Sequence, residues 1–284
     1  MSLNSVNTNI GAAIALQSLN ATASALQGVQ KQISTGYRVA DATDDGAAFA
    51  VAQRVRSDVG ALATANQQLG NVTGLLRTTT TGLTDASNTL ASARDVLVKL
   101  ADSSTQGNTR SNYVTQYKNL VASIKNNLQD ANYSGKTLIG NIGGASGFGA
   151  ISVVRNESGS TYGIATFSGS AFVASINFTS TQLNGAATVA ALIGTASSAT
   201  FINQTNAIGN QLNTYGSASN YVSSQVSYNN DKIDSLNAGL GSLIDADLAK
   251  ESAQLQSLQI RQQLGTQALS IANQAPQSLL SLFK

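Results

Sequence analysis

The chain has 284 residues, which is enough to bury a sizeable core as one large domain or two modest ones. Its 16 Lys and Arg residues nearly balance its 14 Asp and Glu residues, and only 11% of all residues are charged, so electrostatic capture of nucleic acid is not expected. With neither His nor Cys, the chain lacks the commonest general base, the thiol nucleophile, the favoured ligands of zinc, copper and haem, and any disulfide. We therefore predict a protein that is not an enzyme, with no catalytic, cofactor-binding or metal-binding residues and no cofactor.

The start of the chain does not look like a secretory signal. Residues 1–6 lack the basic start and the continuous apolar core of a cleaved signal peptide. No apolar run in the sequence approaches the roughly 20 residues that cross a bilayer, so we expect no membrane insertion. If the protein is exported, it uses another route.

The two ends of the chain are amphipathic but uncharged. Residues 1–30 and 262–283 contain no Asp, Glu, Lys or Arg. Apolar residues three and four apart predict a helix in each end: Leu16, Leu19, Ala23, Leu26 and Ile33 in the first, and Leu248, Leu255, Leu258 and Leu269 in the second. Exposed helices normally have a charged outer face. Uncharged amide and hydroxyl faces instead suit a surface that becomes buried against other copies, where an unpaired charge is costly.

A long helix is predicted after the first of these segments. Thr43, Asp44 and Asp45 provide its N-cap and first-turn residues, and Ser103, Ser104 and Gly107 end it. Leucines recur along it at seven-residue intervals: Leu62, Leu69, Leu76, Leu83, Leu90 and Leu97. Glycines interrupt the helix at about 0.8 to 1 kcal/mol each. Burial of the leucines, at about 1.5 to 3 kcal/mol each, outweighs that cost.

The middle of the chain has a different pattern. A second helix is predicted from about Thr109 to Ala131, with one apolar stripe that includes Tyr113 and Tyr117. Gly and Ser then become frequent from Leu138 to about Ser198. Within that stretch residues 150–156, 161–167 and 171–178 are typical of short strands, which predicts a small β insert.

Heptads return after the insert, and they supply a partner for the leucine seam. Their apolar residues alternate three and four apart from Ile208 to Leu240. We expect residues 239–242, Gly-Leu-Gly-Ser, to break this helix. Asp245 then caps a last helix that ends near Asn273, and Pro276 acts as a stop signal. The predicted fold is mainly α, a long antiparallel helical rod with coiled-coil termini and a small β insert in the middle of the chain.

Several local patterns have a chemical interpretation and a plainer one. Asp245, Asp247 and Glu251 suggest a cation site, but the first two face about 200° apart on a helix, so favourable acids at a helix start are preferred. Asp41, Asp44 and Asp45 receive the same interpretation, with Arg38 or Arg54 as partners. The glycine-rich residues 143–149 lack the Lys-Ser/Thr of a phosphate loop and predict a turn region. Tyr113 and Tyr117 are interpreted as packing residues, and glycosylation of Ser and Thr in the insert stays open.

Short motifs at both ends carry a family resemblance. Residues 6–9 read Val-Asn-Thr-Asn, residues 33–39 read Ile-Ser-Thr-Gly-Tyr-Arg-Val, and residues 44–54 read Asp-Asp-Gly-Ala-Ala-Phe-Ala-Val-Ala-Gln-Arg. Residues 245–251 read Asp-Ala-Asp-Leu-Ala-Lys-Glu, and residues 272–277 read Ala-Asn-Gln-Ala-Pro-Gln. With these motifs in place, the sequence resembles the bacterial flagellins.

The resemblance implies a structural subunit that self-assembles into the helical flagellar filament used for motility, secreted and located outside the cell. It implies three parts: residues 1–40 with 241–284 as a filament-core domain of terminal helices, residues 41–140 with 199–240 as the helical rod, and residues 141–198 as an outward-facing insert. It also implies partners, namely other copies in a helical homopolymer, an export chaperone, a filament cap and hook-junction proteins.

Two alternative functions stay open at this point. A hook-filament junction protein of the same machinery has similar terminal patterning but makes no long homopolymer. A secreted adhesin or immune ligand uses the exposed insert for affinity.

The uncharged ends lead to a first prediction. Short helices containing Gly28 or Gly265 gain little from intrinsic propensity, so both ends should be disordered or frayed in a monomer and ordered in a polymer. Limited proteolysis of monomer and polymer, followed by mass spectrometry, should trim both ends in the monomer alone. Equal resistance of both ends in dilute monomer contradicts it.

Overall fold

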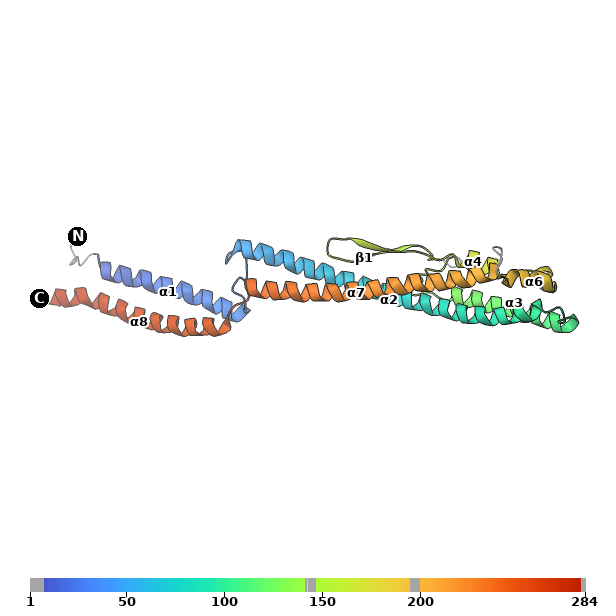
Figure 1. Cartoon of the computed structure of the whole chain (residues 1–284). Helices are drawn as coiled ribbons and strands as arrows, with labels where there is room; N and C mark the ends of the chain where they lie inside the picture. The colour runs from blue at the N-terminus through green and yellow to red at the C-terminus, as the bar shows by residue number, and fades with distance from the viewer. Residues whose placement is uncertain (1–7, 141, 143–146, 195–199, 282–284) are drawn as a thin grey trace. The chain divides into compact units, whose positions relative to one another are not determined.

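A computed structural model describes residues 8–140, 142, 147–194 and 200–281 (Figure 1). The protein is mainly helical with a small two-stranded sheet, as predicted. Its helices and strands are α1 (Ile10–Thr35), α2 (Gly46–Ala101), α3 (Gly107–Gln129), β1 (Ile151–Val154), β2 (Thr161–Ile164), α4 (Gly169–Ile176), α5 (Ser180–Asn184), α6 (Ala186–Ile193), α7 (Thr200–Ile244) and α8 (Leu248–Ser281). The chain forms two compact units, one of Met1–Asp58 with Asp234–Lys284 and one of Val59–Ile233. The first is called the terminal unit and the second the central unit.

In the terminal unit α1 and α8 lie side by side and run antiparallel (Figure 1). The side-chain oxygen of Asn9 caps α1 by accepting a hydrogen bond from the amide of Ala12. The helix ends at Gly36, whose φ of +73° is the left-handed conformation that glycine adopts without strain. The predicted pairing of the terminal helices is therefore confirmed.

The expected break at residues 239–242 is wrong, because α7 continues through both glycines to Ile244. Ile244 is buried in a small cluster with Val39, Ala48 and Ala52. Burial of an isoleucine contributes about 1.5 to 3 kcal/mol, which offsets the cost of two helical glycines, about 1 kcal/mol each.

The start of the last helix also differs from the prediction. Asp247 caps α8, since its Oδ1 accepts from the amides of Ala249 and Lys250 at 3.1 Å each. The amide of Asp245 instead donates to the carbonyl of Gly241 at 2.9 Å and so belongs to the end of α7. Because carboxylates two residues apart both favour a helix start, sequence alone selected the wrong one.

Pro276 does not end the last helix, since α8 runs past Asn273 to Ser281. A proline removes one hydrogen bond from a helix, the bond to the carbonyl four residues earlier. In this protein that carbonyl belongs to Ala272, and it accepts a hydrogen bond from the side chain of Asn9.

The leucine seam forms the core of the central unit. All six heptad leucines are fully buried: Leu62, Leu69, Leu76, Leu83, Leu90 and Leu97. The helix that carries them begins after Asp45, whose Oδ1 accepts from the amides of Ala47 and Ala48 at 3.0 Å. The predicted heptad helix and its capping segment are confirmed.

A pair of asparagines, of which Asn229 is buried and Asn66 half-buried, lies at the contact between α2 and α7. Asn229 is fully buried, and its Nδ2 donates to Oδ1 of Asn66 at 2.8 Å and to the carbonyl of Arg155 at 3.0 Å. Its own Oδ1 accepts from Nε2 of Gln225 at 2.9 Å. Apolar contacts alone leave two helices free to slide. The buried Asn229 and the half-buried Asn66 satisfy each other in one alignment, which fixes the register of α2 and α7.

In the described part of the insert there are a hairpin and three short helices. Strands β1 and β2 pair antiparallel, with Ile151 opposite Ile164. Lys232 of α7 forms an ion pair with Glu157 at 2.5 Å, and Nη1 of Arg155 donates to the hydroxyl of Tyr221 at 3.0 Å, so the end of the hairpin is held against α7.

The third predicted strand, residues 171–178, is wrong. These residues form most of α4, because Phe172 and Ile176 lie four apart and both are buried on one helical face. Thr179 and Gln182 then form a capping box that starts α5. The β-branched and aromatic residues of this segment favour a strand by composition. The segment is nevertheless helical, because its buried residues are spaced as on one face of a helix.

Two glycines of α2 give a matched test of how closely Ala131 packs against this helix. A Cβ on Gly70 meets nothing within 4 Å, whereas a Cβ on Gly82 lies 2.6 Å from Cβ of Ala131. Gly70→Ala should stabilise the monomer by about 0.8 to 1 kcal/mol through helix propensity. Gly82→Ala should destabilise it by about 1 to 3 kcal/mol through overpacking. Urea unfolding followed by circular dichroism measures both; equal effects contradict the close approach of residue 131 to α2.

Candidate assembly surface

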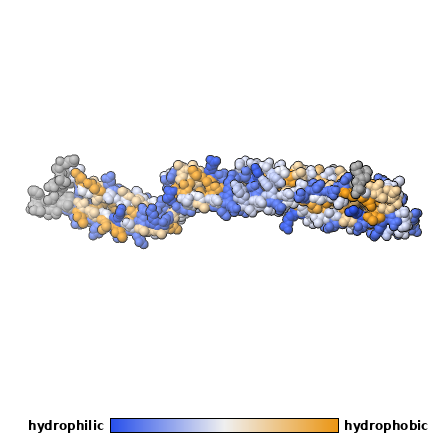
Figure 2. Space-filling model, viewed as in Figure 1, coloured by the Kyte–Doolittle hydropathy of each residue, from blue (hydrophilic) through white to orange (hydrophobic). Residues whose placement is uncertain are grey.

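Large apolar side chains are exposed along the α1–α8 pair. In α1 they are Ile10, Ile14 and Leu16, and in α8 they are Leu248, Ile260, Leu264 and Ile271. Ile14 is 62% exposed, and Leu264 and Ile271 are each 64% exposed. Figure 2 shows apolar residues at the surface along this pair. Soluble monomers seldom expose so many large apolar side chains on one element pair, and such surfaces mark sites of association.

Charge is confined to one end of the same pair. The 26 residues of α1 contain one charged residue, Lys31, close to the C-terminal end of the helix. The charged residues of α8 are Lys250, Glu251 and Arg261, all in its first half. Because the helices are antiparallel, these charges gather where the two linkers join them, and the remainder of the pair is uncharged.

The contact between α1 and α8 is thin. Val29 and Leu258 are buried in this pair, and a Cβ on Gly265 would lie 3.2 Å from Cδ1 of Leu19. Two helices with so small a shared core gain little free energy from pairing in water. The expected disorder of both ends in a monomer stays a prediction, and the thin contact is consistent with it.

The two linkers beside the charged end are hydrogen-bonded to each other. The amides of Arg38 and Val39 donate to the carbonyl of Ile244 at 2.7 and 3.2 Å, and the amide of Ala246 donates to the carbonyl of Gly36 at 3.0 Å. The guanidinium of Arg38 donates to the carbonyl of Leu243. These bonds tie the segment after α1 to the segment before α8.

Lys31 forms ion pairs with two carboxylates of the linker between α1 and α2. Its Nζ lies 2.6 Å from Oδ2 of Asp41 and 2.8 Å from Oδ1 of Asp44. Asp44 also accepts from the amides of Ala40 and Asp41. The hydrogen bond from Lys31 holds the pKa of Asp41 and that of Asp44 below their ordinary value, and the same bonds raise the pKa of Lys31.

The partner expected for these carboxylates was Arg38 or Arg54, and the structure places Lys31 there instead. The sequence did contain a signal for Lys31, since it is the first charged residue after 30 uncharged ones. That signal is positional only, because nothing in a linear pattern says that the chain turns back within ten residues.

The other predicted candidates have structural roles. Tyr117 is fully buried, stacks on Phe178 with ring centroids 5.9 Å apart, and donates its hydroxyl hydrogen to the carbonyl of Ile176 at 2.6 Å. Tyr113 packs against the same core. Of the glycine-rich loop, residues 143–146 lie outside the described residues.

The described part of the chain has neither a metal-binding cluster nor a membrane-spanning helix. Within it, no group of three or more acidic, His or Cys side chains is placed to hold a metal ion, and Asp245, Asp247 and Glu251 form no such group. Among the same residues, no helix is both long and apolar enough to cross a membrane.

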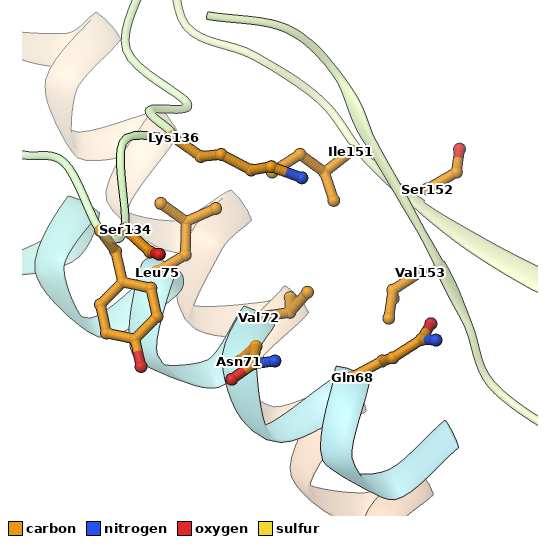
Figure 3. A pocket seen from close by; sticks show the side chains of 10 residues that line it. Gln68, Asn71, Val72, Leu75, Ser134, Lys136, Ile151, Ser152 and Val153 are labelled. Atoms are coloured by element: carbon orange, nitrogen blue, oxygen red, sulfur yellow. The ribbon is translucent and has the colours of Figure 1, made fainter. Parts of the chain in front are cut away.

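One cavity of about 430 Å³ lies between α2, the segment around Ser134 and strand β1 (Figure 3). Val72, Leu75 and Ile151 give it apolar walls, and Lys136 is the charged residue of its lining. No carboxylate accompanies Lys136 in that lining, so the cavity does not present the paired acid and base of a proton-transfer site.

Comparison with known proteins identifies the family. The bacterial flagellin N-terminal helical region matches residues 6–143, and the bacterial flagellin C-terminal helical region matches residues 199–283. The chain is 34% identical to flagellin FljM of Caulobacter vibrioides, with all of both chains covered, and 33% identical to a flagellin of Brucella melitensis, with 99% of each covered. In fold it is similar to a putative flagellar hook-associated protein from Vibrio parahaemolyticus, with a TM-score of 0.55 and 18% identity over 71% of this chain and all of the other.

The chain therefore belongs to the bacterial flagellins, a family of structural, non-enzymatic proteins. It is a filament-forming subunit of the bacterial flagellum and acts in the extracellular filament. The resemblance seen in the terminal motifs is confirmed. The exposed apolar pair is accordingly the candidate surface for polymerisation.

The ion pairs of Lys31 lead to a titration test. Because the folded pKa of Asp41 and of Asp44 is lowered, the stabilisation of the linker is complete above about pH 4 and is lost as pH falls below it. Lys31→Met should return both carboxyl pKa values toward the ordinary value, as measured by carboxyl-carbon NMR titration. Lys250→Met, on an exposed lysine of the same unit, should change neither; unchanged Asp41 in Lys31→Met contradicts the pairing.

Proposed function

We propose that the exposed apolar face of the α1–α8 pair is the surface through which subunits polymerise, and that it forms the core of the filament. The observation that carries the proposal is that five of the seven exposed isoleucines and leucines lie in residues 1–30 and 262–283, which contain no charged residue. Each large apolar side chain contributes about 1.5 to 3 kcal/mol when it is fully buried. Seven such side chains provide ample driving force for association in spite of its entropic cost.

The absence of charge supports burial against further copies. A single unpaired charge enclosed in such a contact costs several kcal/mol, which would cancel the contribution of one or two apolar side chains. Amide and hydroxyl side chains avoid that penalty and can hydrogen-bond to neighbouring copies. A contact between different faces of successive copies does not close on itself, so it yields an open helical polymer.

The three-part division of the chain fits this mechanism. Residues 1–40 with 241–284 form the filament-core domain, residues 41–140 with 199–240 form the surrounding helical domain, and residues 141–198 form an outward-facing insert. The hydrogen-bonded linkers support the boundary near residue 40, because they separate the uncharged helices from the leucine-rich core.

The proposed accessory partners act on the same surface. A flagellar export chaperone covers α8 before assembly, since Ile260, Leu264 and Ile271 leave its apolar face open to water. Helix binding in an apolar groove is the recognition mode that suits such a face. Filament cap and hook-junction proteins contact the ends of the polymer, where the face of the last subunit is uncovered.

The test places a charge on the proposed surface. Ile14→Asp should abolish elongation of short filament seeds by purified subunits, observed by electron microscopy, because assembly would bury an unpaired carboxylate. Ile14→Val is the matched control and should elongate seeds nearly as well as the wild type. Elongation by Ile14→Asp at the wild-type rate contradicts the proposal. Absence of long filaments from wild-type subunits favours the junction-protein alternative.

A further inference from the structure

Asn9 makes two hydrogen bonds through opposite ends of its side-chain amide. Its Oδ1 accepts from the amide of Ala12 at 3.0 Å and so caps α1. Its Nδ2 donates to the carbonyl oxygen of Ala272 on α8 at 2.7 Å. One side chain therefore both begins the first helix and bonds it to the last.

The carbonyl that Asn9 reaches is unusual within its helix. In an α-helix each carbonyl accepts from the amide four residues later, and for Ala272 that residue is Pro276. Proline has no amide hydrogen, yet α8 continues beyond it to Ser281. Pro276 is the single proline of the chain, so Ala272 has the one carbonyl that a proline deprives of its helical donor.

We infer that Asn9 is a positioning residue, which supplies the hydrogen-bond donor that Pro276 withholds and thereby sets the register of α1 against α8. Apolar contact is non-directional, and among the described residues no ion pair joins α1 to α8 and so aligns the two helices. If α1 slides along α8 by one helical turn, Asn9 and Ala272 move apart by about 5.4 Å, and the hydrogen bond between them is lost.

The inference rests on the proposed function, because the hydrogen bond matters most when other copies exclude water from the pair. In an isolated subunit Ala272 is partly exposed, and water is a ready substitute donor. Within the polymer an unsatisfied carbonyl bears its full desolvation penalty. Loss of this hydrogen bond should therefore weaken polymerisation more than it destabilises the isolated subunit.

The experiment combines changes at Asn9 with a change that restores the missing amide. Asn9→Asp keeps an oxygen that caps α1 but has no donor, and Asn9→Ser is an uncharged cap too short to reach α8. Pro276→Ala returns an amide hydrogen to the carbonyl of Ala272. Critical concentrations for seeded polymerisation are compared for each change alone and in combination.

Both Asn9 variants should raise the critical concentration about tenfold in the chain that retains Pro276, which corresponds to 1.4 kcal/mol. With Pro276→Ala present, the same variants should change it by less than about twofold, since Ala272 then has its own donor. An equal effect in both backgrounds, no effect in either, or an effect of Asn9→Asp without one of Asn9→Ser overturns the inference.

A second measurement uses the unaltered protein. Solid-state NMR of filaments with ¹⁵N in asparagine side chains and ¹³C in alanine carbonyls should detect through-space transfer between Nδ2 of Asn9 and the carbonyl carbon of Ala272. Absence of that transfer overturns the inference without any variant. If wild-type subunits do not polymerise, the proposed function fails and this inference with it; if wild type and Ile14→Asp behave as expected but Asn9 variants behave as wild type, the inference alone fails.

Discussion

The burial of apolar side chains is the constraint on which this structure depends, and the terminal helices leave several of theirs exposed. The pair formed by α1 and α8 buries little between its helices and exposes isoleucine and leucine along both. In a globular protein such apolar side chains are buried in the protein's own core. The remaining surface is charged, and this charge prevents association with other molecules. In this flagellin residues 1–30 and 262–283 stay uncharged, and we propose on that ground that burial of the same surface drives assembly.

Directional polar contacts complement this non-directional force at two places. In the central unit Asn229 and Asn66 align α2 with α7, and Asn229 also bonds the end of the hairpin through Arg155. In the linkers Lys31 holds two carboxylates in place. Each of these polar groups has its partners, so register is specified at modest cost in desolvation.

Long periodic segments were the most predictable features. The heptad leucines and the uncharged amphipathic ends each repeat a physical signal over many residues, so errors at single positions do not matter. Boundaries were less predictable. Residues 239–242 and Pro276 are helix breakers by propensity, but burial of Ile244 offsets the cost of the two glycines. Beside Pro276, the side chain of Asn9 donates to the carbonyl of Ala272, which has no helical donor.

The sequence by itself determined that the chain is mainly helical, that its ends are suited to burial against other copies, and that it lacks the side chains of most catalytic sites. These properties follow from composition and periodicity, which act locally. Only the tertiary structure decided that residues 171–176 are helical, that Lys31 pairs with Asp41 and Asp44, and that Asn9 reaches Ala272. The physical reason is that each of these outcomes depends on which atoms meet in space, and hydrogen bonds between residues 263 positions apart leave no periodic trace in the chain.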